Sequence, residues 1–210
     1  MNDLFRPVLA DIFAAVLGVE YTKIPGVDVD FFFRIDDAEL LILFEETTNR
    51  VDWRHNFQFF RKPYREMTDR WYAHRGFLKC WKAVEPYLAE AIKNPAVQHI
   101  TVAGYSHGAA LALLCHEYCK FNRPELGDAI VGFGFGCPRV VWGPLPPAVR
   151  SRFEGFTVVR NVGDIVSHVP PALFGFRHVG EMLKVGRRGK YGPFKAHFPE
   201  SYISELEVLK

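Results

Sequence analysis

The chain has 210 residues, of which 49% are apolar and 24% carry a charge, proportions that are ordinary for globular proteins. Its formal net charge is only +2, and it has no long run of like charges, so we expect no nucleic acid or other polyanion as a partner. The length suits one sizeable domain with its own core, and we expect a single domain over residues 1–210.

The start of the chain does not read as a signal peptide. Asp3 and Asp11 interrupt its apolar residues, whereas a signal peptide has a basic start and an unbroken apolar middle. No stretch approaches the ~20 apolar residues of a membrane span. The four cysteines include no C-x-x-C pair, which favours free, mostly buried thiols. We therefore expect a cytoplasmic location by default, with secretion after processing as the alternative.

The first half of the chain predicts two helices and a β-hairpin. Two apolar runs rich in Phe, Ile and Leu flank the turn-forming pair Asp36-Asp37, which is typical of a hairpin. The segment 47–73 mixes aromatic and charged residues and predicts irregular structure. The elements are expected at residues 3–18 (helix), 29–35 and 39–45 (hairpin) and 77–93 (helix).

The second half alternates strands and helices. Strands are expected at residues 99–103, 129–136, 156–161 and 181–185, and helices at 107–121 and 199–209. Such alternation implies an α/β domain with a central, mostly parallel sheet flanked by helices. In these sheets the reactive groups collect at the carboxyl ends of the strands.

One motif lies at such a strand end. Gly104-Tyr105-Ser106-His107-Gly108 matches G-x-S-x-G, the nucleophile elbow, in which the serine occupies a strained turn between a strand and a helix. A Cβ atom at either glycine would collide with a neighbouring strand or helix. The amino end of the following helix would face the negative charge that develops at the serine.

A serine hydroxyl becomes a good nucleophile only when a base removes its proton, usually a histidine that a carboxylate orients. In this fold the chain order is serine, acid, histidine. Asp164 is the best candidate acid, because it follows the predicted strand 156–161, whereas Asp128, Glu154 and Glu181 lie before or at the start of strands. The candidate histidines are His197, which lies on a loop that can reach the carboxyl edge, His178 and His168.

The sequence resembles the class 3 lipases, a family of α/β-hydrolases that includes the fungal triacylglycerol lipases. The matching pieces, from about residue 39 onward, are ELLILF before Thr47, Asp52-Trp53, AHRGF at 73–77, VAGYSHGAALA at 102–112, FGFGCPRV at 133–140, VRNVGDIVSHVPP at 159–171, FRHVGE at 176–181 and HFPESYI from His197. Their order along the chain makes the resemblance specific.

The resemblance implies an α/β-hydrolase fold with Ser106 as nucleophile, Asp164 as orienting acid and His197 as base. It implies an oxyanion hole from the backbone N–H groups of Thr47 and His107, and no metal or organic cofactor. The chain has Glu45-Glu46 where the family has Arg-Gly, which puts two acids near that hole. His107 replaces an apolar residue, so its ring is either a pocket wall or an additional proton shuttle.

The expected activity is hydrolysis of carboxylic esters of the acylglycerol type through an acyl-enzyme. The alternatives are a phospholipase or acyltransferase that uses the same site, and a non-catalytic binding module. The segment 48–73 holds seven aromatic residues and six Lys or Arg residues. It is either a solvated cover loop or a cationic flap that makes transient contact with a lipid interface.

Overall fold

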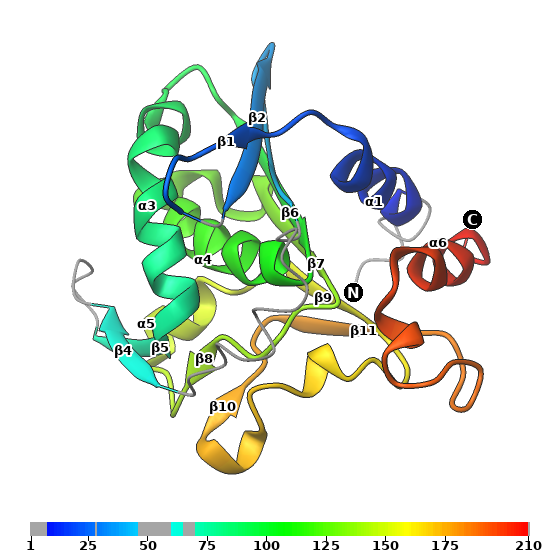
Figure 1. Ribbon diagram of the computed structural model, residues 1–210. Coiled ribbons are helices and arrows are strands. Elements are labelled where there is room, and N and C mark those ends of the chain that lie inside the picture. The colour runs from blue at the N-terminus through cyan, green and yellow to red at the C-terminus, as the bar shows by residue number, and fades with distance from the viewer. Residues whose placement is uncertain (1–7, 28, 46–59, 65–69, 210) are drawn as a thin grey trace.

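The computed structural model describes residues 8–27, 29–45, 60–64 and 70–209. In this part of the chain seven strands form one sheet in the order β1-β2-β3-β6-β7-β9-β11 (Figure 1). From β3 to β11 all neighbours are parallel, and β1 and β2 pair antiparallel at one edge. The strands are Thr22–Lys23 (β1), Asp30–Asp36 (β2), Glu39–Phe44 (β3), His99–Tyr105 (β6), Ile130–Phe135 (β7), Phe156–Asn161 (β9) and Glu181–Val185 (β11).

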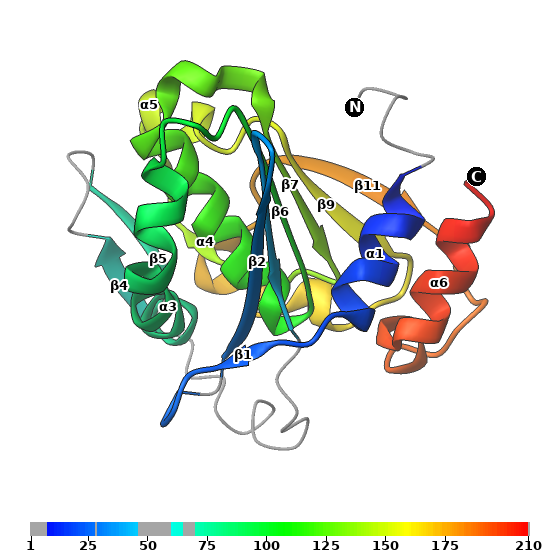
Figure 2. The same cartoon turned by 90° about the horizontal axis from the view of Figure 1, so that it is seen from above.

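Helices cover both faces of this sheet, as Figures 1 and 2 show together. α3, α4 and α5 pack on one face and share one apolar core with it, and α1 and α6 close the other face over a second core. The helices are Leu9–Gly18 (α1), Arg75–Lys93 (α3), His107–Asn122 (α4), Pro147–Ser151 (α5) and Pro199–Glu207 (α6). No helix in the described residues is long and apolar enough to cross a membrane.

Most elements expected from the sequence are confirmed. The hairpin pairs Asp36 with Glu39 across its turn, and the strands and helices from residue 75 onward begin and end within a few residues of the expected positions. Cys115, Cys119 and Cys137 are buried and form no disulfide. The first helix begins at Leu9, and residues 1–7 lie outside the described part of the chain.

The expectation of irregular structure over 47–73 is wrong for the residues that the structure describes. Within that segment lie β4 (Arg61–Tyr64) and β5 (Trp71–His74), which join β8 (Val141–Trp142) and β10 (Phe176–Arg177) in a small sheet of order β10-β8-β5-β4. Two to four residues are too few for a periodic signal. The strands are fixed by tertiary contacts instead. Trp81 Nε1 donates to Tyr64 Oη over 2.9 Å. The Trp71 ring packs edge-on against the Phe153 ring, with centroids 5.6 Å apart.

The amino end of α4 lies directly against the carboxyl end of β3. A Cβ atom built on Gly108 would come within 2.4 Å of the Phe44 carbonyl oxygen and 2.5 Å of the Glu45 carbonyl oxygen. These are backbone atoms, which cannot rotate away as a side chain can. Glycine at position 108 therefore sets how closely the helix approaches the sheet, as the motif predicts.

Gly108→Ala is expected to lower the free energy of unfolding by about 3 kcal/mol or more, because the added methyl group overlaps backbone atoms. Urea denaturation monitored by circular dichroism measures the change. Gly18→Ala in α1 is the control, because a Cβ atom there meets no atom within 4 Å. It should change the stability by less than about 1 kcal/mol. Equal stabilities for the two variants would contradict the packing argument.

Candidate active site

Ser106 occupies a strained turn between β6 and α4. Its φ of 56° and ψ of −116° belong to a conformation that costs a non-glycine residue about 1–3 kcal/mol. The turn is fixed on both sides, since the Ser106 N–H donates to the Phe135 carbonyl of β7 over 2.8 Å. On the other side, a Cβ atom at Gly104 would lie 2.3 Å from the Gly108 carbonyl oxygen. The sequence thus folds locally into the elbow that its glycine spacing predicts.

The structure brings together the three side chains that the sequence nominated. His197 Nε2 lies 2.8 Å from Ser106 Oγ, and His197 Nδ1 lies 2.9 Å from Asp164 Oδ2. All three residues are buried. Because a carboxylate only accepts hydrogen bonds, Nδ1 carries the proton towards Asp164, and Nε2 accepts a hydrogen bond from the serine hydroxyl. This arrangement can transfer the serine proton to the imidazole.

The Asp164 carboxylate has a hydrogen-bond donor at each oxygen. The Val166 N–H donates to Oδ1 over 2.8 Å, and the Tyr202 hydroxyl donates to Oδ2 over 2.6 Å. The Tyr202 hydroxyl oxygen also accepts from the Asn161 N–H over 3.0 Å. Burial, followed by the charge of Asp164, raises the pKa of Tyr202 well above its usual value. The phenol therefore stays a donor, and it fixes α6 to the end of β9.

His197 is held by contacts that sequence analysis did not identify. The Tyr105 ring stacks on the imidazole, with centroids 5.1 Å apart and planes 21° apart, and its hydroxyl donates to the His197 carbonyl. Gly136 has a φ of +60°, and a Cβ atom there would lie 2.9 Å from His197 Cε1 and 3.1 Å from Asp164 Oδ2. Tyr105 lies inside the G-x-S-x-G motif, directly before the nucleophile, and this position in the sequence already places it near the site.

The other two candidate histidines contact the loop between β9 and β10, residues 162–175, which holds Asp164 and is called the acid loop here. His168 Nδ1 is 2.8 Å from the Asp164 backbone carbonyl oxygen, and its other ring nitrogen is 2.5 Å from the Arg160 guanidinium. His178 Nε2 is 2.8 Å from the Ser167 carbonyl oxygen, and burial lowers its pKa to about 4. Both rings are thus occupied away from Ser106, whereas His197 contacts it directly.

Of the two expected oxyanion donors, only His107 lies in the described residues, and Thr47 lies outside them. His107 begins α4, where backbone N–H groups have no partner within the helix. Its ring packs 5.5 Å from the Phe77 ring. Burial, followed by the proximity of His74, lowers its pKa to about 4. The ring is therefore neutral near pH 7, which favours the pocket-wall interpretation over the proton shuttle.

Of the two acids expected near the oxyanion hole, only Glu45 lies in the described residues. The Glu45 charge contributes, after burial, to raising the pKa of Tyr21, so this carboxylate lies near Tyr21, while Glu46 is outside the described residues. In the described part of the chain, no group of three or more His, Cys, Asp or Glu side chains is arranged to hold a metal ion.

Comparison with known proteins identifies the class. The model of the family Lipase (class 3) matches residues 41–174. A lipase of Rhizomucor miehei is 29% identical over 150 residues, which cover 69% of this chain and 41% of that protein. The secreted mono- and diacylglycerol lipase 1 of Fusarium solani is 26% identical over 145 residues, 67% of this chain and 42% of that protein. The solved Rhizomucor miehei triacylglyceride lipase superposes with a TM-score of 0.64 at 22% identity, covering 86% of this chain and 77% of that one.

The fold is that of the α/β-hydrolases. The chain belongs to the class 3 lipase family. It spans about two fifths of the length of the curated relatives just described. Because the Fusarium protein is described as secreted, the expectation of a cytoplasmic location finds no support among these relatives.

The contacts of Tyr202 yield a stability prediction. Tyr202→Phe is expected to lower the free energy of unfolding by about 1–3 kcal/mol, because it leaves the buried Asn161 N–H without an acceptor and removes a donor to Asp164. Tyr87→Phe is the matched control, since Tyr87 is 54% exposed, and it should stay within about 0.5 kcal/mol of the parent. Thermal and urea denaturation provide the comparison. Equal free energies of unfolding for Tyr202→Phe and Tyr87→Phe would mean that the Tyr202 hydroxyl does not help to hold Asp164.

Proposed function

We propose that this protein is a serine hydrolase that cleaves carboxylic esters of the acylglycerol type. The observation that carries the proposal is the hydrogen-bonded chain from the Ser106 hydroxyl through His197 to Asp164, with distances of 2.8 and 2.9 Å. This is the geometry that an activated serine nucleophile requires: a base within hydrogen-bond reach, itself oriented by a third group. Membership of the class 3 lipase family supports the ester class of substrate.

In the proposed mechanism Ser106 Oγ attacks the ester carbonyl carbon while His197 Nε2 takes its proton. Asp164 keeps the imidazole in the required tautomer and stabilises the imidazolium that forms. The tetrahedral intermediate collapses as the carbon–oxygen bond to the alcohol breaks, and His197 protonates the departing alcohol. Water then repeats the attack on the acyl-enzyme with His197 again as base, which releases the acid and restores the serine.

The negative charge of the intermediate needs donors that are in place before the reaction. The amino end of α4, a helix of 16 residues, lies beside Ser106 and directs the positive end of its dipole towards the reacting oxygen. The His107 N–H is the donor we assign from the described residues. The Thr47 N–H is the second donor that the family resemblance implies.

Apolar side chains close to the catalytic residues support acyl or aryl esters as substrates. Ile165 directly follows Asp164, Phe198 directly follows His197, and Phe194 lies three residues before it. All three are more than one third exposed, although apolar side chains of this size are usually buried. An acyl chain that contacts these residues would remove apolar surface from water, so longer acyl chains should bind more tightly.

The proposal is tested with p-nitrophenyl esters of increasing acyl length. Ser106→Ala should lower kcat at least about 1,000-fold, because the nucleophile is lost while the fold is kept. Ser151→Ala, at an exposed serine of α5, is the control and should keep full activity. A fluorophosphonate should label the parent protein and the control but not Ser106→Ala. Hydrolysis at equal rates by the parent and Ser106→Ala would exclude Ser106 as the nucleophile.

Adding a short alcohol to the same assay separates hydrolysis from acyl transfer. A hydrolase should release mainly the free acid even when the alcohol is present, whereas an acyltransferase should form mainly the new ester. Chromatographic analysis of the products distinguishes these outcomes.

A further inference from the structure

Three cations lie beside the acid loop, at one edge of the large sheet. Arg160 is in β9, and Lys184 of the edge strand β11 is its partner in the parallel register. Partners in register point to the same face of a sheet, so these two side chains are neighbours. Arg139, between β7 and β8, contacts the loop directly, since its guanidinium donates to the carbonyl oxygens of His168 and Pro170, the latter over 2.9 Å.

His168 connects the two arginines. Its ring Nε2 lies 2.5 Å from Arg160 Nη2, and its Nδ1 lies 2.8 Å from the Asp164 carbonyl oxygen. Because a guanidinium only donates hydrogen bonds, Nε2 accepts and Nδ1 carries the proton towards the carbonyl. The backbone carbonyl of His168 accepts from Arg139. Both guanidinium groups therefore contact one neutral residue of the acid loop.

The pKa values of neighbouring groups report how close these charges are. Burial, followed by the charge of Arg160, lowers the pKa of Arg139. Burial is also the main reason why the pKa of His178 is lowered to about 4, and the charges of Arg139 and Arg160 both add to the lowering. The two guanidinium groups thus produce a positive potential that a third group senses.

No carboxylate balances these cations within the described residues. None of the ion pairs formed there includes Arg139, Arg160 or Lys184. Asp164 meets His168 through its backbone carbonyl, while its carboxylate contacts His197. Both arginines are partly buried, and placing two partly desolvated like charges together is unfavourable. An anion bound between them would remove that cost.

Both guanidinium groups keep donors that solvent can reach. Arg160 Nη1 and Arg139 Nη2 have no hydrogen-bond partner within the described residues, and neither atom is buried. Guanidinium groups donate parallel N–H bonds to phosphate oxygens, and an ammonium adds a point charge. Lys184 is exposed and can supply that charge. The donors therefore suit a small oxyanion that reaches them from solution.

We propose that Arg139, Arg160 and Lys184 form a binding site for a small dissolved dianion of the phosphate type, which bridges β9, β11 and the acid loop. The guanidinium N–H groups donate to the oxyanion, and the Lys184 ammonium adds charge. Because Arg139 also holds two carbonyls of the acid loop, the bound anion stabilises the loop that carries Asp164. This site goes beyond the proposed ester hydrolysis, and binding to it requires no catalysis.

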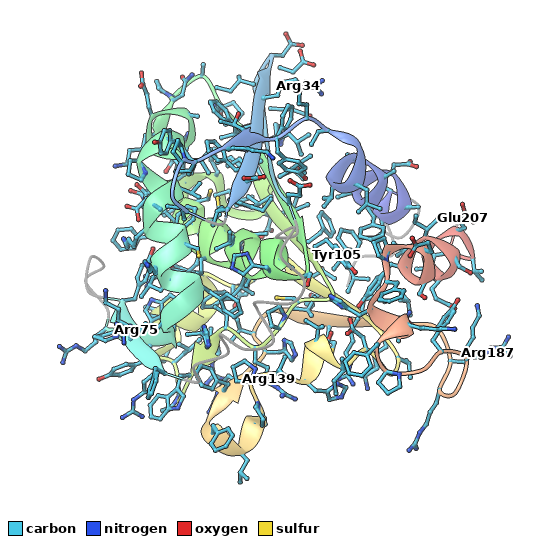
Figure 3. The ribbon with its side chains drawn as sticks, viewed as in Figure 1. Arg34, Arg75, Tyr105, Arg139, Arg187 and Glu207 are labelled. Atoms are coloured by element: carbon cyan, nitrogen blue, oxygen red, sulfur yellow. The ribbon has the colours of Figure 1, made fainter. Side chains whose placement is uncertain are left out.

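The test is calorimetric titration and thermal denaturation with sodium phosphate, compared with sodium chloride at the same pH and ionic strength. Phosphate should bind and raise the Tm, and chloride should not match this rise. Arg160→Gln should weaken phosphate binding at least about tenfold, because charge-assisted hydrogen bonds are lost. Arg34→Gln is the matched control, since Arg34 lies at the opposite end of the molecule from Arg139 (Figure 3). It should bind phosphate as the parent does.

Lys184→Gln keeps the test decisive if Arg160→Gln fails to fold, because Lys184 is exposed. It should weaken phosphate binding about two- to fivefold, as expected for an exposed charge. Circular dichroism without phosphate checks the fold of each variant. Unchanged phosphate affinity in the folded site variants would overturn the proposal. A Tm rise that chloride reproduces would reduce the effect to general screening and overturn it as well.

Hydrogen exchange tests the effect of the anion on the acid loop. Phosphate should slow amide exchange across residues 162–175 in the parent protein and in Arg34→Gln, but not in Arg160→Gln. Equal exchange of this loop with and without phosphate in the parent protein would overturn the proposed stabilisation of the loop.

Discussion

The strained turn at Ser106 is the constraint on which the rest of the site depends. Its conformation is unfavourable for any side chain, and it persists because β6, β7 and α4 fix the backbone on both sides. The Ser106 N–H bonds to β7, and the glycine at 108 lets the helix reach the carbonyls that end β3. The same packing that imposes the strain sets the hydroxyl at the carboxyl edge of the sheet, beside the amino end of a helix.

The buried carboxylate of Asp164 is the second constraint on the fold. Asp164 is fully buried, and burying an unpaired charge is costly unless hydrogen bonds replace its water. The Val166 N–H, the His197 ring and the Tyr202 hydroxyl supply them, and they come from the acid loop, the turn before α6 and α6 itself. One carboxylate thus ties together segments that are up to 38 residues apart, and Gly136 leaves the space in which they meet.

The carboxyl ends of the parallel strands position the serine, and the small sheet lies next to them through the contacts of His74 and Phe77.

The sequence by itself determined the elements whose signals are local: the hairpin at 36–39, the long apolar strands, the helices and the elbow at Ser106, whose glycine spacing encodes its own geometry. The sequence also nominated His197 as the base, but only the tertiary structure gives its contact with Ser106, since 91 residues separate the two partners. The tertiary structure also decided the small sheet within 47–73 and the supporting roles of Tyr105, Gly136 and Tyr202. Short strands and contacts between distant residues leave no periodic pattern in a sequence, because they arise only when separate elements pack together.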